Sequence, residues 1–197
     1  MTKITDHLEQ PDGYTCQSAA IAKVLGKTTH HEVWDVRSAL LEDARRSGTM
    51  SGDPHVMGRY LAPRVEEYHY NPKASLNDIV DWVVRGKGYE VIIHGFTTSA
   101  GHVWGIEDAT PRNDPSRVNF QCDDPWYEMD FPRNEFTRRS GANVVYSDCA
   151  IWAYCVMAWN NAQAVEAYAR ALSNVHDEDF QDSMYETRGA WVHFIKN

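Results

Sequence analysis

Long hydrophobic runs are absent from this sequence of 197 residues. No stretch reaches the ~18 consecutive apolar residues that a membrane-spanning helix requires, so we expect no membrane insertion. Residues 1–10 are polar and mixed in charge, without the apolar segment of a secretory signal peptide. We therefore expect synthesis in the cytoplasm, and delivery or release of the protein to act elsewhere stays open.

The sequence has few cysteines, and they are irregularly spaced: Cys16, Cys122, Cys149 and Cys155. Without a CxxC pair they are too few for a disulfide framework or a thiolate zinc site, so we expect reduced thiols. His30 and His31 do not indicate a metal site either, because neighbouring side chains on a helix point ~100° apart. The sequence thus predicts no metal and no cofactor.

Basic residues are outnumbered, with 19 Lys and Arg against 28 Asp and Glu, which gives a net charge of −9. An acidic surface repels phosphate groups, and no basic cluster interrupts it here. We therefore expect no nucleic-acid partner.

Linker segments are absent as well, since the 12 glycines and 8 prolines are scattered and no internal repeat occurs. With 43% hydrophobic residues, the chain can bury a sizeable core without disulfides or metals. We predict one domain over residues 1–197. It has a core at about 1–126 and a C-terminal elaboration at 127–197 that completes the sheet.

Helix signals dominate the first half of the chain. Thr29 with Glu32, and Ser75 with Asp78, have the spacing of capping boxes, and each pair predicts the start of a helix. Four helices are expected before the first clear strand. They cover about 16–25, 30–47, 54–61 and 76–85.

Branched and aromatic residues favour β-structure after residue 88. The predicted strands are 89–96, 102–108, 117–122 and 190–195. A helix is predicted at 161–172 and a solvated loop at the acidic run 177–182, while the apolar run 144–159 leaves helix and strand open. Helices followed by strands predict an α+β fold, with N-terminal helices packed on an antiparallel sheet.

Cys16 is predicted to be the first residue of a helix. The free N–H groups and the dipole at a helix N-terminus stabilise negative charge, which favours the reactive thiolate. The preceding loop, residues 10–15, can hold the side chain of Gln10 near the sulfur as an oxyanion donor. This pattern indicates a nucleophilic cysteine, and the three other cysteines are interpreted as buried structural thiols.

A catalytic cysteine needs a base, and the base needs an acceptor that orients it. His102 follows a glycine at the start of a predicted strand, from which its side chain can project toward a cleft. Asp124 follows the next predicted strand, so a hairpin of the two strands would bring it beside His102. Asp123 is the alternative, because it is adjacent and neighbouring strand residues face opposite sides.

Four features together resemble the C39 and C39-like peptidases of the papain-like superfamily. They are the Gln10-x5-Cys16 spacing, the Ala-rich helix after the cysteine, the Gly-His strand at residue 102 and the strand that ends in Asp124-Pro125. The resemblance covers roughly residues 4–126. It implies that Gln10 is the oxyanion donor, Cys16 the nucleophile, His102 the base and Asp124 the residue that orients the histidine.

The resemblance implies a papain-like fold and a thiol hydrolase core. Many C39 members have Asp-Cys-Gly or Ser-Cys-Gly at the nucleophile, whereas this sequence has Thr15-Cys16-Gln17, and no transporter segments follow. We therefore do not expect the processing of leader peptides within an exporter.

We predict a cysteine protease or amidase that cleaves a peptide or amide bond through an acyl-enzyme. The expected partner is a protein or peptide substrate. A phage-type endolysin acting on peptidoglycan stem peptides and an effector acting on one protein both fit, and the acidic charge favours a basic protein segment over the acidic murein peptide. Two alternatives stay open: an acyl transferase with the same triad, and a catalytically silent papain-like domain that binds a protein.

Overall fold

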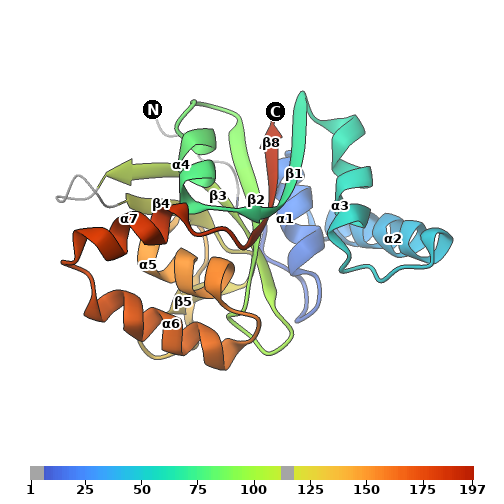
Figure 1. Cartoon of the computed structure of the whole chain (residues 1–197). Coiled ribbons are helices and arrows are strands. Elements are labelled where there is room, and N and C mark those ends of the chain that lie inside the picture. Colours follow the sequence, from blue (N-terminus) through green and yellow to red (C-terminus); the bar gives the residue numbers. More distant parts are fainter. Residues whose placement is uncertain (1–6, 112–117) are drawn as a thin grey trace.

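The computed structural model describes residues 7–111 and 118–197 (Figure 1). It is an α+β structure with a six-stranded antiparallel sheet and a separate two-stranded hairpin, which confirms the predicted class. The helices are α1 (Cys16–Val24), α2 (His30–Ser47), α3 (Pro54–Leu61), α4 (Leu76–Val83), α5 (Asp148–Ile151), α6 (Asn161–Ser173) and α7 (Glu178–Glu186). The strands are β1 (Glu67–Ala74), β2 (Tyr89–Gly95), β3 (His102–Pro111), β4 (Val118–Asp123), β5 (Tyr127–Asp130), β6 (Glu135–Ser140), β7 (Val144–Ser147) and β8 (Ala190–Lys196). A 3₁₀ turn (Ala62–Arg64) follows α3, and a π-helical segment (Trp152–Met157) follows α5.

The predicted starts of the four N-terminal helices are confirmed. α2 begins after Thr29 and α4 after Ser75, and both capping boxes are formed. α1 and α3 begin at Cys16 and Pro54. Gly48 caps the C-terminus of α2, and its φ of 68° is a left-handed conformation that glycine adopts without strain. Within the described ranges, none of the helices combines the length and apolar character needed to cross a bilayer.

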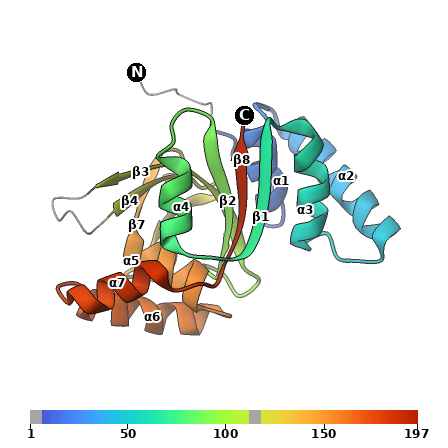
Figure 2. The same ribbon diagram turned by 45° about the horizontal axis from the view of Figure 1, so that its top comes forward.

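The six strands are ordered β1-β8-β2-β3-β4-β7, and every neighbouring pair is antiparallel. β8, the last strand in the sequence, therefore lies between two strands from the first half of the chain, β1 and β2 (Figure 2). At the other edge β7 pairs with β4. The residues after 126 thus supply two strands of this sheet, one of them in its interior.

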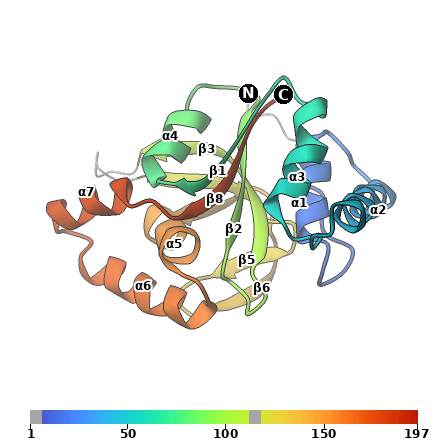
Figure 3. The same ribbon diagram turned by 45° about the vertical axis from the view of Figure 1, so that its right-hand side comes forward.

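Helices cover both faces of the sheet, and β2 shows how the sequence specifies this. Val91, Ile92 and Ile93 are all buried, although successive side chains of a strand point to opposite faces. Ile92 packs into one core cluster with residues of α1, α2 and α3, whereas Val91 and Ile93 belong to a second cluster with residues of α4 and α5–α7. Figures 1 and 3 show α1–α3 gathered at one side of the molecule and α4–α7 at the other.

Two predictions about local structure are wrong. β1 precedes α4, so three helices rather than four come before the first strand. β1 is a largely exposed edge strand that contains Pro72, so it lacks the buried alternation that marks a strand in the sequence. The acidic run 177–182 is not a loop but the start of α7. Asp177 caps this helix by accepting a hydrogen bond from the backbone N–H of Phe180, and acidic residues in a first turn favour the helix dipole.

The apolar run 144–159, for which the sequence left helix and strand open, contains both. It begins as β7 and continues through α5 into the π-helical segment. Most of its residues are buried, so polar and apolar positions do not alternate with either period.

Lys23 ties α1 to three strands of the sheet. Its side chain is only 5% exposed, and its Nζ lies 3.3 Å from Glu90 Oε2 on β2 and 3.9 Å from Asp123 Oδ2 on β4. It also donates to Glu107 on β3. A buried ammonium group among carboxylates from adjacent strands opposes any shift of α1 relative to the sheet.

We expect Lys23→Met to destabilise the protein by about 3–5 kcal/mol, because the substitution leaves three carboxylates that are only 9–20% exposed without their cation. Urea unfolding followed by circular dichroism measures this change. Lys27→Met is the matched control, since Lys27 is 42% exposed and its pair with Glu32 lies on the surface; it should cost about 0–1 kcal/mol. Equal costs for the two variants would contradict the proposed role of Lys23.

Candidate active site

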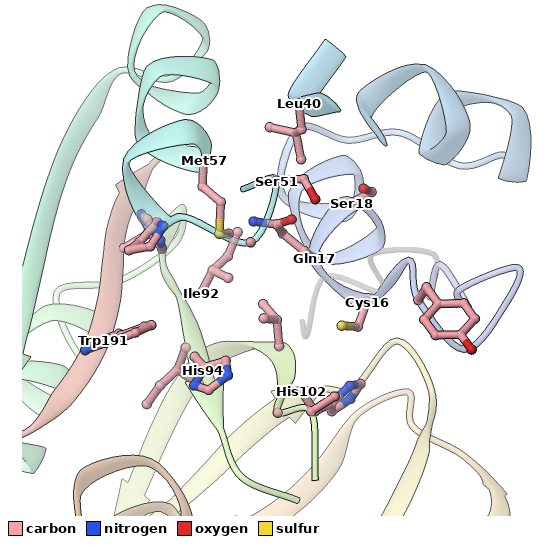
Figure 4. A pocket seen from close by; sticks show the side chains of 18 of the residues that line it. Cys16, Gln17, Ser18, Leu40, Ser51, Met57, Ile92, His94, His102 and Trp191 are labelled. Atoms are coloured by element: carbon pink, nitrogen blue, oxygen red, sulfur yellow. The ribbon is translucent and has the colours of Figure 1, made fainter. Parts of the chain in front are cut away.

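Three of the predicted site residues come from three elements that meet at one end of the sheet. Cys16 is the first residue of α1, His102 the first residue of β3, and Asp124 follows β4 directly. β3 and β4 are antiparallel neighbours, so the start of β3 and the end of β4 lie at the same sheet end. In Figure 4, Cys16 reaches from the helix toward His102 on the sheet below it.

A glycine is required immediately before His102. Gly101 has a φ of 81°, in the left-handed region, and a Cβ at this position would lie 2.1 Å from Nε2 of His94. A larger residue would therefore strain the backbone and displace His94. The Gly-His pair that marked this strand in the sequence has a steric cause.

Asp124 holds His102 in a buried hydrogen bond. His102 Nε2 lies 2.7 Å from Asp124 Oδ1, and the carboxylate is completely buried. The other carboxylate oxygen accepts a 3.0 Å hydrogen bond from the hydroxyl of Tyr146, and Oδ1 also accepts from the backbone N–H of Trp126. Because Nε2 is engaged with Asp124, Nδ1 is the ring nitrogen left for the sulfur of Cys16.

The electrostatics of the pair favour a thiolate and an imidazolium. Burial alone would raise the pKa of Cys16, but hydrogen bonds and charge from His102, with the backbone N–H groups of Val103 and Gln17, lower it below the ordinary 9.0. Burial alone would lower the pKa of His102, but Asp124 and Cys16 together raise it to about 10. Each partner therefore stabilises the charged form of the other.

Asp123 makes different contacts from Asp124. Its carboxylate faces Lys23 and accepts a hydrogen bond from His7, whereas Asp124 faces His102. The two side chains point apart, as expected for successive residues at the end of a strand. Asp124 is thus the one of the two candidates that the structure places beside the histidine.

Gln10 lies in the loop before α1, next to the residues that follow β4. Its backbone N–H donates to the carbonyl of Pro125, which brings the loop before α1 against the residue that follows Asp124. Its side chain is buried, with Nε2 donating to the carbonyl of Asp12 and Oε1 lacking a partner. One N–H of the Gln10 amide is therefore committed to its own loop and one is left for another acceptor.

The three other cysteines are buried and lie in the core opposite α1. Burial raises the pKa of Cys122 and of Cys155 well above the ordinary value, so both favour the thiol form. Cys16 differs from Cys122 and Cys155 in having a cation beside its sulfur.

Sequence reasoning missed the residues that support Asp124. Tyr146 lies in the apolar run without periodicity, where no pattern distinguishes it from a core aromatic. Gly141 accepts a 2.9 Å hydrogen bond from the backbone N–H of Asp124, and a Cβ at Gly141 would lie 2.1 Å from the carbonyl oxygen of Asp124. The loop after β4 therefore fits against a residue without a side chain.

A cavity of about 230 Å³ opens beside Cys16 and His102 (Figure 4). Its wall includes Leu40 and Met57 from the helices and Ile92, His94, Val103, Trp191 and His193 from the sheet. Burial lowers the pKa of both His94 and His193 to about 4, so these two imidazoles are neutral at pH 7. The cavity is therefore apolar or neutral over most of its surface, next to a reactive pair.

No metal site accompanies the pair: within residues 7–111 and 118–197, no group of three or more His, Cys, Asp and Glu could hold a metal ion. His30 and His31 are exposed on α2.

Comparisons with protein-family models, curated proteins and solved structures found no match to this chain.

Cys16 should react with iodoacetamide faster than the three other cysteines, and its rate should reach half of its maximum below pH 9.0, because its pKa is lowered. Mass spectrometry of tryptic peptides over pH 4–10 measures this profile. In His102→Ala, Cys16 keeps its surroundings but loses the neighbouring imidazolium. The pH at which alkylation reaches half of its maximal rate should therefore rise by roughly one unit or more relative to the unsubstituted chain. An unshifted profile would show that His102 does not act on the thiol.

Asp124→Ala should lower the rate of Cys16 alkylation at pH 7 by at least about tenfold, because a paired charge shifts a pKa by roughly 1–3 units. Asp123→Ala is the matched control. Its rate of Cys16 alkylation per folded molecule should stay within about twofold of that of the unsubstituted chain, since the Asp123 carboxylate faces Lys23 and not His102. Asp124→Asn should retain part of the rate, because its amide oxygen still accepts the imidazole N–H. A larger loss in Asp123→Ala than in Asp124→Ala would exchange the two assignments.

Proposed function

We propose that this protein is a papain-like cysteine hydrolase that cleaves a peptide or amide bond. The observation that carries the proposal is the alignment of the half-buried Cys16 thiol, at a helix N-terminus, with the buried His102 imidazole and Asp124 carboxylate. A helix that begins at the cysteine and packs on an antiparallel sheet bearing the other two residues supports the papain-like fold. The cavity beside the sulfur supports a substrate site.

The first half of the reaction follows from the charges of the pair. The Cys16 thiolate attacks the carbonyl carbon, forming a C–S bond, and the carbonyl oxygen becomes an oxyanion. The bond to the leaving nitrogen then breaks, and that nitrogen takes the proton of the His102 imidazolium and departs as an amine. The product on the enzyme is a thioester at Cys16, with a neutral imidazole beside it.

Water completes the reaction. The neutral His102 accepts a proton from water as the water oxygen attacks the thioester carbonyl, and the C–S bond breaks to release a carboxylic acid. Asp124 keeps the imidazole oriented and stabilises its charged form in both halves. The thiolate and imidazolium are restored at the end of the cycle.

The oxyanion requires donors close to the sulfur. The backbone N–H of Cys16 is among the first N–H groups of α1, which have no partner within the helix. The remaining N–H of the Gln10 amide is the proposed second donor. Gln10→Ala should therefore lower turnover by about 100-fold, as for other single oxyanion donors, while leaving alkylation of Cys16 nearly unchanged.

Turnover is tested by mass spectrometry of new protein termini after incubation of the full chain with a cell extract and, separately, with purified murein. We expect cleavage products that are missing in Cys16→Ala, and a hydroxylamine-sensitive thioester on Cys16 during the reaction. If added amines capture the acyl group in place of water, the protein is an acyl transferase. Selective alkylation without any product or thioester would favour a catalytically silent binding domain.

A further inference from the structure

A second cavity of about 110 Å³ adjoins the one beside Cys16. It is lined by His94, Phe96, Cys155, Ala158, Trp159, Gly189 and Trp191. His94 and Trp191 also line the first cavity, so the two hollows share a wall. The far end of the second cavity is made by residues of the C-terminal third of the chain.

The shared wall consists of packed rings. The ring centroids of His94 and Trp191 are 5.5 Å apart, and His94 also packs edge-on against Phe96 at 4.9 Å. Trp159, on the loop between the π-helical segment and α6, is 71% exposed at the far end. A tryptophan exposed at the rim of an apolar hollow contributes contact area that a bound partner can cover.

The charge of this surface differs from that of the whole molecule. Although the chain has 28 acidic residues, neither cavity has an aspartate or glutamate among its described lining residues. The charged lining groups are Arg37 and the thiolate–imidazolium pair of Cys16 and His102, since His94 and His193 are neutral at pH 7. A basic substrate side chain would thus lose its hydration here without gaining a carboxylate.

We propose that the two cavities form one substrate cleft that binds an extended peptide with apolar side chains at two positions. The position nearer the scissile bond fills the cavity beside Cys16, and the farther one contacts Trp159 and Trp191. This proposal rests on the proposed hydrolase and specifies its substrate class. It replaces the expectation of a basic substrate, which net charge alone suggested, and it assigns a specificity-determining role to residues of the segment 127–197.

The test uses two reagents of different size on the full chain. Iodoacetamide reports on the thiolate alone. Peptidyl vinyl sulfones report on the cleft as well, because the Cys16 sulfur adds to the terminal vinyl carbon and the adjacent carbon takes the proton of His102. Matched probes carry Leu or Lys at one of the three positions before the warhead.

We expect Leu to react faster than Lys by about tenfold at two of the three positions, which corresponds to burial of one leucine side chain. In Trp159→Ala the preference at the farther position should fall to about twofold or less, and in Trp191→Ala the preference should fall at both. Leu172→Ala is the control, since Leu172 is 45% exposed on α6 and lines neither cavity. Thermal unfolding verifies that each variant is folded.

The outcomes separate the cleft from the hydrolase. Equal rates for Leu and Lys, or a preference that survives both tryptophan substitutions, would overturn the cleft. Cleavage products that are missing in Cys16→Ala would still uphold the hydrolase in that case. If iodoacetamide does not select Cys16 in the unsubstituted chain, the hydrolase fails, and the cleft fails with it.

Discussion

The packing of α1 on the sheet is the contact on which the rest of the site depends. The helix carries the thiol and the sheet carries the imidazole and its carboxylate, so a small slide of one against the other separates them. Lys23 resists such a slide, because a shift of one helical turn, about 5.4 Å, would remove its ammonium from the carboxylates of three strands. Apolar contacts between the same surfaces are less sensitive to direction.

Two consecutive aspartates link the packing of α1 to the position of His102. Asp123 holds the helix through Lys23, and Asp124 holds the imidazole, from opposite sides of the same backbone. The position of β4 therefore sets both the placement of the helix that carries Cys16 and the orientation of His102. Gly141 and Tyr146 hold Asp124 through hydrogen bonds, so the carboxylate that faces His102 stays buried away from water.

Local sequence explains why much of this arrangement could be predicted. Caps, capping boxes and a glycine before a strand specify Cys16 and His102 through contacts within a few residues. The choice between the two aspartates could not be made that way, because it depends on the pairing of β3 with β4, which shifts register between Ile106 and Asp108. The edge strand β1 and the rim at Trp159 were missed for a related reason: their positions are set by distant segments.

The place of β8 has a consequence for the order in which the molecule is made. On the ribosome β1 is synthesised long before β8, the strand that pairs with it and separates it from β2. The nascent chain therefore cannot complete the middle of its sheet until the C-terminal strand has left the exit tunnel. The part of the cavity wall that carries Trp191 and His193 is absent until then. Cys16, His102 and Asp124 are thus all synthesised before the cavity beside them is complete.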